Sequence, residues 1–173
     1  MIHTSINSAR RRLVLGFGTM CAAIGIWLAR DTPVLAQMTA SDEIKRRNLE
    51  AVERYVAAWR AGDRAALAAS YHDEFTLHYF GRNPLAGDHV GKPAAIKTLV
   101  ELSRRTNRRL LEIVDVMAGP HRAVVIAREA FERGGQRVEL ERVLVFTIKD
   151  GLLHHCWVYD RDQTLVDRFL ADG

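Results

Sequence analysis

The chain has 173 residues, of which 48% are apolar and 27% charged, values typical of one soluble globular domain. Residues 1–36 contain four arginines and one aspartate, whereas residues 37–173 contain 21 basic and 20 acidic side chains. The length excludes a multidomain enzyme, and the nearly balanced charge of residues 37–173 argues against a nucleic-acid partner.

Residues 1–36 have the pattern of an export signal. Three arginines at 10–12 precede an uncharged apolar run over residues 13–28, and small residues lead up to Ala36. This pattern predicts a twin-arginine-like signal peptide over residues 1–36, cleaved near Ala36, and a periplasmic or extracellular mature protein. The alternative is an uncleaved membrane anchor over residues 13–29, which would be the chain's one contact with a membrane.

The mature chain begins with a region in which helices are predicted. Ser41 and the two acidic residues after it are typical of a helix start, and apolar residues repeat at helical spacing from Leu49 to Trp59. A short second helix is expected over residues 63–71, a strand over 74–80 and, after a glycine-containing loop, a third helix over 93–105.

Four strand-like segments follow, separated by glycine-containing turns, and a last helix is predicted near residues 165–170. The segments cover residues 108–118, 121–133, 136–149 and 151–160. Short turns between neighbouring strands predict an antiparallel meander. The fold class is therefore α+β: a cone-shaped, curved antiparallel sheet with the N-terminal helices packed on its concave face. Such a concavity suits a small-molecule ligand.

Several segments of residues 37–173 are recognisable. Residues 52–63 resemble the first helix and turn of bacterial ketosteroid isomerases, and residues 78–92 resemble a loop of SnoaL-like polyketide cyclase relatives. Residues 145–151 and 157–160 continue the similarity. The resemblance identifies a SnoaL-like domain over residues 37–173, in the nuclear transport factor 2-like superfamily, and it implies a homodimer. One scaffold of this kind hosts many reactions, so the resemblance implies the fold more specifically than the chemistry.

The resemblance also implies catalytic positions. Tyr55 corresponds to the tyrosine that donates a hydrogen bond to the developing oxyanion, and His78 corresponds to the carboxylate base. An imidazole can also accept a proton near neutral pH, so His78 is the predicted base. Leu144 replaces the protonated acid that supplies the second oxyanion donor, and a true steroid isomerase is therefore not expected.

Alternation along the strands predicts which other side chains face the pocket. Asp160 is expected either to orient His78, to pair with Arg142, or to cap the C-terminal helix, and it completes the predicted catalytic set. Arg142 resembles the arginine that lies between carboxylates in limonene-epoxide hydrolases, but their carboxylate is absent at Leu144. The predicted substrate-binding residues are Trp59, Arg142, Leu144, Phe146, Cys156 and Val158.

No metal site and no cofactor are expected. His154 and His155 are adjacent, so a regular strand would place them on opposite faces and prevent joint metal ligation. Trp157 and Tyr159 would face outward, which predicts a covered sheet face and most simply a homodimer interface.

Two functions fit these observations. The first is a cofactor-free isomerase, cyclase or dehydratase acting on a small apolar carbonyl or cyclic substrate, with His78 as base and Tyr55 as oxyanion donor. The second is a non-catalytic module of the same fold that binds a small apolar ligand or dimerises, which Leu144 in place of a catalytic acid favours.

Overall fold

The computed structural model describes residues 28–171. The chain divides into two units, residues 1–36 and residues 37–173, and the description below concerns the second unit. Most of the predicted export signal, including the uncharged run that could form an anchor, lies outside the described residues. Within the described residues, none of the helices combines the length and hydropathy needed to cross a bilayer.

Helix α1 (Leu28–Ala61) places an apolar stripe against the sheet. Val52, Tyr55 and Val56 are buried, at the helical spacing predicted from the sequence. The predicted helix start at Ser41 is wrong, because α1 begins upstream and runs through this residue. No proline or glycine interrupts residues 38–48, and Glu43 pairs with two arginines along the next turn, so the helix continues here.

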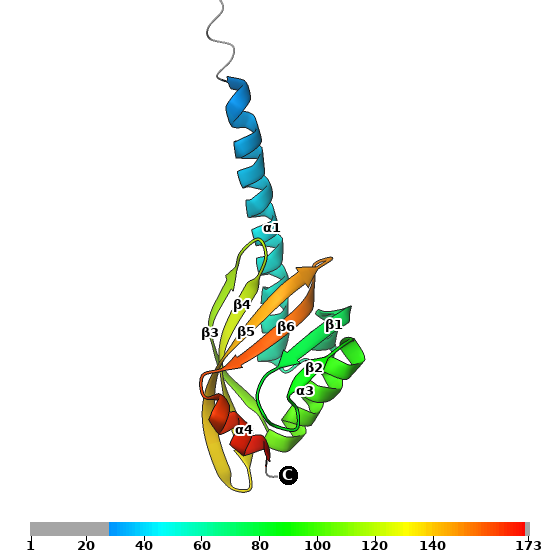
Figure 1. The fold of residues 1–173 in the computed structure, drawn as a ribbon, viewed down its shortest axis with the longest axis vertical. Helices are drawn as coiled ribbons and strands as arrows, with labels where there is room; N and C mark the ends of the chain where they lie inside the picture. Colours follow the sequence, from blue (N-terminus) through cyan, green and yellow to red (C-terminus); the bar gives the residue numbers. More distant parts are fainter. Residues whose placement is uncertain (1–27, 172–173) are drawn as a thin grey trace, which may run out of the picture. The chain divides into compact units, whose positions relative to one another are not determined.

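Six strands form one mixed sheet, in the spatial order β2-β1-β6-β5-β4-β3 (Figure 1). The antiparallel meander predicted for the last four strands is confirmed by the β3–β4, β4–β5 and β5–β6 pairings. The expected all-antiparallel sheet is wrong for one pair, because β1 runs parallel to β6. The short β2 was not predicted. The strands are β1 (Tyr71–Tyr79), β2 (Gly87–His89), β3 (Arg109–Ala118), β4 (Ala123–Arg133), β5 (Gln136–Lys149) and β6 (Leu152–Asp160).

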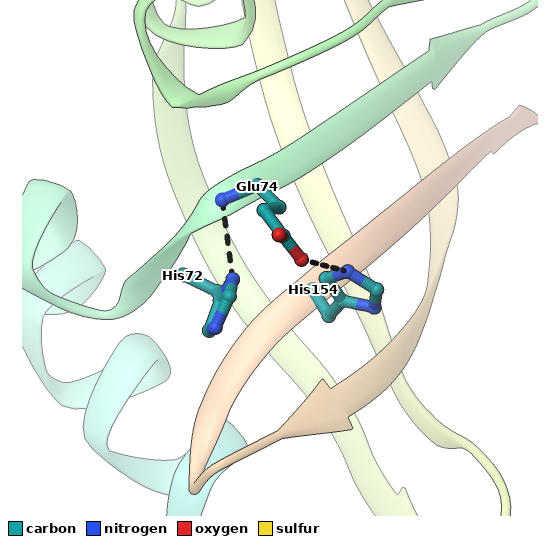
Figure 2. A group of neighbouring side chains, drawn as sticks. All are labelled: His72, Glu74 and His154. Carbon is teal, nitrogen blue, oxygen red and sulfur yellow. Dashed lines mark hydrogen bonds and ion pairs between the residues drawn. The ribbon is translucent and has the colours of Figure 1, made fainter.

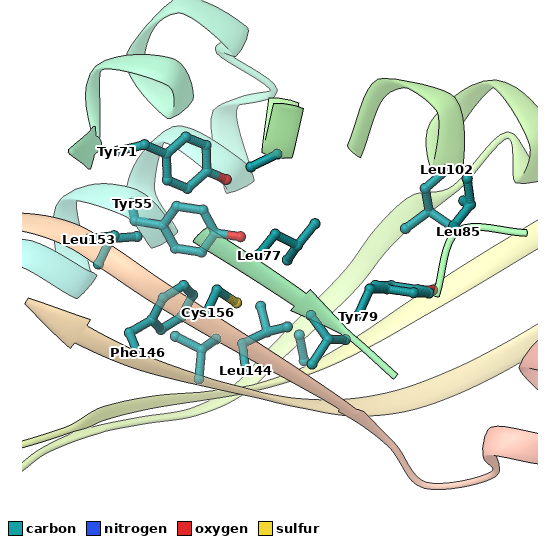
Figure 3. Close-up of a cluster of buried hydrophobic side chains, with 14 of the residues drawn as sticks. Tyr55, Tyr71, Leu77, Tyr79, Leu85, Leu102, Leu144, Phe146, Leu153 and Cys156 are labelled. Carbon is teal, nitrogen blue, oxygen red and sulfur yellow. The ribbon is translucent and has the colours of Figure 1, made fainter. Parts of the chain in front are cut away.

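The remaining helices are α2 (Arg64–Ala69), α3 (Lys92–Thr106) and α4 (Gln163–Ala171). Helices α1 and α3 contribute Tyr55 and Leu102 to the buried cluster on the inner face of the sheet (Figure 3). Helix α4 packs near the β4–β5 hairpin, where Phe169 lies 6.1 Å from Phe131 between ring centroids. The inner face of the sheet is therefore enclosed by helices, and this enclosure positions the candidate site.

Strand β6 is irregular at His154. Against β5, Thr147 pairs with His155 and Ile148 pairs with Leu153, so His154 is one extra residue in the ladder. Against β1, the register also shifts, because Tyr71 pairs with Leu153 whereas Thr76 already pairs with His155. Four residues of β1 therefore lie opposite this single histidine, and such a bulge re-aims side chains away from strict alternation.

Candidate functional site

The inner face of the sheet contains a deep recess of about 20 Å³, room for about one water molecule. Seven of the nine predicted site residues line it, from α1, β5 and β6. Their predicted orientation toward the interior thus agrees with the structure, while their roles in binding or catalysis stay predictions. The seven are Tyr55, Trp59, Arg142, Leu144, Phe146, Cys156 and Val158.

Two phenols meet in this recess. The ring centroids of Tyr55 and Tyr71 lie 6.0 Å apart, and their hydroxyl groups lie on the same side of the cluster (Figure 3). Burial raises the pKa of Tyr55 well above its ordinary value and likewise raises the pKa of Tyr71, so both phenols remain protonated donors. Burial also raises the pKa of Cys156, which keeps this thiol protonated and argues against a thiolate nucleophile.

Arg142 is the centre of a buried ionic network. Its guanidinium donates to both carboxylate oxygens of Asp160 at 2.6 and 2.8 Å, to Glu129 Oε2 at 2.9 Å and to the hydroxyl of Tyr79 at 2.9 Å. Burial lowers the pKa of Arg142, but the interactions with Tyr79, Asp160 and Glu129 outweigh this effect, and the net pKa is raised. The arginine is therefore a fixed cation with its donors already engaged.

This network resolves the alternatives for Asp160. Its carboxylate pairs with Arg142. The two residues are directly opposite each other in the β5–β6 pairing, with Arg142 on β5 and Asp160 on β6. The alternative in which Asp160 caps the last helix is wrong, because the Asp162 carboxylate accepts from the Leu165 amide there. The alternative in which Asp160 orients His78 is also wrong, since both of its oxygens are occupied by Arg142.

An open groove of about 560 Å³ adjoins the recess. Helices α1, α2 and α3 and strand β3 form its walls, and its apolar lining includes Leu67 and Leu99. Three arginines, Arg64, Arg104 and Arg108, line the same groove. The recess and the groove share a common set of lining residues, so the narrow recess lies directly beside the wide groove. The shared residues are Trp59, Tyr71, Leu99, Arg108 and Glu129.

Glu129 is the carboxylate at the junction of recess and groove. Its side chain is 1% exposed; Oε2 is held by Arg142, and Oε1 lies 3.4 Å from an Arg108 guanidinium nitrogen. Arg108 is itself oriented by Ser103, whose hydroxyl accepts from Arg108 Nε at 3.0 Å. The Oε1 contact is long for a charge-assisted hydrogen bond, so this oxygen is held less tightly than Oε2.

The predicted placement of His78 beside Tyr55 is wrong. His78 stacks on Trp157 at 4.7 Å between ring centroids and bonds to His155 at 3.0 Å and to Asp88 at 2.7 Å, on the outer face of the sheet. Its strand neighbours Leu77 and Tyr79 line the recess instead. Because side chains alternate along a strand, His78 must point to the opposite face.

The predicted separation of His154 and His155 is also wrong. Their ring centroids lie 4.4 Å apart, which opposite faces of a strand would not allow. His154 does not line the recess with Cys156, as strict alternation predicted, because it is the bulged residue of β6. The bulge instead brings His154 to His72 and Glu74 on β1 (Figure 2).

Sequence reasoning missed several polar residues of the pocket, among them the three that line both the recess and the groove: Tyr71, Arg108 and Glu129. Tyr71 was assigned to the end of a helix; Asp73 and Glu74, which follow it, are residue types depleted in strands, so the local sequence gave little signal that the strand begins here. Arg108 was expected as the first residue of the strand-like segment over residues 108–118. Glu129 lies two residues from each of the apolar residues Ala127 and Phe131, and this period-two spacing was the available signal for an inward carboxylate.

The sequence matches a known domain family. The SnoaL-like domain family matches residues 52–155. The chain belongs to this family. The SnoaL-like domain was thus predicted correctly from the helix, loop and strand segments, and the matched range contains Tyr55, Tyr71, Glu129 and Arg142.

Solved structures resemble this SnoaL-like domain closely in fold. Bal32a from a soil-derived mobile gene cassette is 27% identical, with a TM-score of 0.67 over 73% of this chain and 98% of Bal32a. An NTF2-like protein from Burkholderia xenovorans LB400 is 23% identical, with a TM-score of 0.61 over 73% of this chain and 97% of that protein. TerC co-crystallized with polyporic acid is 18% identical, with a TM-score of 0.62 over 73% and 99% of the two chains. No curated protein matches the sequence. The fold is therefore α+β and NTF2-like.

Proposed function

We propose that this SnoaL-like domain binds a small, largely apolar cyclic or carbonyl-bearing compound in the pocket formed by the groove and the recess. The observation that carries the proposal is an apolar groove of about 560 Å³ beside the recess, with a phenol, an arginine and a carboxylate that line both. Pockets with an apolar lining and a few converging polar groups are typical small-molecule sites.

The charge of the groove narrows the ligand class. Arg64, Arg104 and Arg108 line it, whereas Glu129 is the acidic residue in its lining. Arg108 pairs with Glu129 and Arg104 pairs with Glu101, so the positive charge that the groove presents to a ligand comes mainly from Arg64. A compound with an anionic or enolisable oxygen is therefore favoured over a cationic one.

The chemistry that these residues support is proton transfer without a cofactor. A neutral phenol in a desolvated position stabilises negative charge as it develops on a substrate oxygen, and Tyr71 reaches both the recess and the groove. Glu129 Oε1 is the proton acceptor in this scheme, in place of His78. Tyr55 lies beside Tyr71, with 6.0 Å between the ring centroids, and supports the position of that ring.

A specific observation favours non-catalytic ligand binding as a second function. Both inner carboxylates are paired with arginine, and Leu144 leaves the recess with one polar group fewer than an isomerase requires. Such a pocket can hold a ligand without turning it over. The two functions share the pocket and differ in whether removal of the Tyr71 hydroxyl abolishes a reaction.

The location and assembly of the protein are part of this proposal. Export through residues 1–36 with cleavage near Ala36 is supported by the sequence pattern of that segment. A homodimer through the outer sheet face is supported by Tyr159, which is 49% exposed and lies 5.0 Å from Phe80 between ring centroids.

A fluorescent probe tests the pocket. The apolar anion 1-anilinonaphthalene-8-sulfonate suits the groove's lining and charge, and its titration should show saturable binding to the full chain. Leu99→Trp fills the junction and should weaken binding at least about tenfold, because an added ring excludes the probe from the pocket. Val90→Trp is the matched control, since Val90 is 73% exposed and does not line the groove. Equal binding by both variants would refute the pocket as the ligand site.

A further inference from the structure

The outer face of the sheet carries a cluster with the composition of a metal site. His72 and Glu74 on β1 and His154 on β6 each offer one ligand atom, and these atoms all lie within 4.8 Å of one another (Figure 2). Glu74 Oε2 lies 3.7 Å from His154 Nε2. Two ligands of a tetrahedral zinc ion are separated by about 3.3 Å when each lies about 2.0 Å from the metal. The present separation is close to that value.

Local backbone geometry explains why these three side chains meet. His72 and Glu74 are two residues apart on one strand, and alternation places them on the same face. His154 is the bulged residue of β6, opposite the stretch of β1 that contains both partners. A regular β6 would have pointed His154 toward the recess with Cys156, so the bulge creates the cluster.

The surroundings of the cluster also fit a bound cation. Asp150 Oδ2 lies 3.8 Å from His72 Nε2, where its negative charge favours an N–H group on that nitrogen and leaves Nδ1 as the ligand atom. His72 Nδ1 accepts from the Glu74 amide at 3.1 Å, so a metal ion that binds this nitrogen replaces that hydrogen bond. Both imidazoles are largely buried and thus held in place, whereas the side chain of Glu74 is 66% exposed and can adjust.

We propose that His72, Glu74 and His154 bind a divalent transition-metal ion, with Zn²⁺ as the best-matched common ion. Two imidazoles and one carboxylate are a ligand set that zinc accepts with water in its remaining position, and nitrogen ligands disfavour Mg²⁺ and Ca²⁺. The exposure of Glu74 leaves that remaining position open to solvent.

Lys149 competes with the metal for the carboxylate. Its ammonium is hydrogen-bonded to Glu74 Oε2, the same oxygen that faces His154. The lysine side chain is 43% exposed, so it can leave this contact when a divalent ion arrives. The ammonium thus neutralises Glu74 in the metal-free protein. A metal ion must displace it, so the affinity of Glu74 for the ion is lowered by the free energy of an exposed ion pair.

Zinc titration of the full chain without a histidine tag tests the site. Isothermal titration calorimetry should show one Zn²⁺ per chain with a dissociation constant below about 100 μM, and both His154→Ala and Glu74→Gln should weaken it at least about tenfold. Lys149→Met should tighten binding about twofold to fivefold, because the competing ion pair is removed. Circular dichroism of each variant verifies the fold, and Glu74→Gln alters an exposed side chain that a folded domain tolerates.

The matched control is His121→Ala, which removes an exposed histidine from the β3–β4 turn, outside the cluster. It should bind Zn²⁺ as the unchanged protein does. A loss of binding in His121→Ala would show adventitious histidine binding and overturn the site, as would unchanged binding in both Glu74→Gln and His154→Ala. Weaker binding by Lys149→Met would place the ion elsewhere. Co²⁺ gives a second readout, since its visible absorption bands on the full chain should disappear in Glu74→Gln.

Discussion

The two faces of the sheet use ionisable side chains in opposite ways. On the inner face, Arg142 is surrounded by Asp160, Glu129 and Tyr79, and each of its three side-chain nitrogens donates a hydrogen bond. On the outer face, His78 bonds to Asp88 and to His155, and His155 has a lowered pKa because of burial and of the neighbouring His154 and His78. The inner charges are therefore fixed by one another in a buried network, whereas the outer histidines gather where solvent reaches them.

This difference teaches that abundance of histidine is a poor guide to the pocket of this domain. The outer face gathers His72, His78, His154 and His155, but the enclosed pocket is lined by phenols, arginines and a carboxylate. An apolar ligand is desolvated where the protein encloses it, and in this domain the enclosed pocket lies on the inner face of the sheet. Variants that disturb one face and spare the other test this division.

The largest expected effect is on stability, from Arg142→Met. Removing the guanidinium leaves Asp160 and Glu129 buried without their partner, and breaking a buried pair in this way costs about 3–5 kcal/mol of unfolding free energy. Urea denaturation measures the loss. Arg128→Met is the control, because Arg128 pairs with Glu112 and Glu139 while 45% exposed and should cost less than about 1 kcal/mol. Similar losses in the two variants would contradict the fixed inner network.

The next effect is on catalysis, from Tyr71→Phe. This change keeps the ring that stacks on Phe75 at 4.3 Å and deletes the hydroxyl, so stability should change little. If the pocket performs proton transfer, kcat on a compound recovered from it should fall about 100-fold, the typical loss for one oxyanion donor. Tyr159→Phe, on the outer face, should leave kcat unchanged. Full activity in Tyr71→Phe would leave ligand binding as the function.

How much of the fold and of the candidate site the sequence predicts depends on whether a feature follows from a local pattern or from strand pairing. Period-two alternation placed Arg142, Leu144 and Phe146 correctly, because β5 is regular there. The same rule, applied to β1, gives Leu77 and Tyr79 inside and His78 outside, but the family resemblance was weighted above it.

Other features left no local signal. The contact of His154 with His72 depends on a bulge and on a parallel pairing between strands about 80 residues apart, neither of which a local pattern reveals. Similarly, the second carboxylate beside Arg142 comes from Glu129 on β4 rather than from position 144 on the same strand. Both contacts depend on which strands pair and in which register, and not on the local sequence.

The smallest expected effect is the pH dependence of an exposed pair on α3. Hydrogen bonds from Arg104 and Arg105 lower the pKa of Glu101 from 4.5 to about 2. A carboxyl group with a lowered folded-state pKa adds stability above pH 4.5 and loses it as the pH falls toward 2. Thermal unfolding should therefore show Glu101→Gln slightly less stable than the unchanged protein at pH 7, with the gap closing near pH 2. A gap that widens in acid would contradict this assignment.

The most direct test of the division between the faces is a crystal structure of the chain purified from its own host, with whatever small molecule it retains. The account predicts density for an organic compound in the groove, with an oxygen near the Tyr71 hydroxyl and an anionic or polar end near Arg108. Density against His78 and Trp157 instead, with an empty groove, would contradict it.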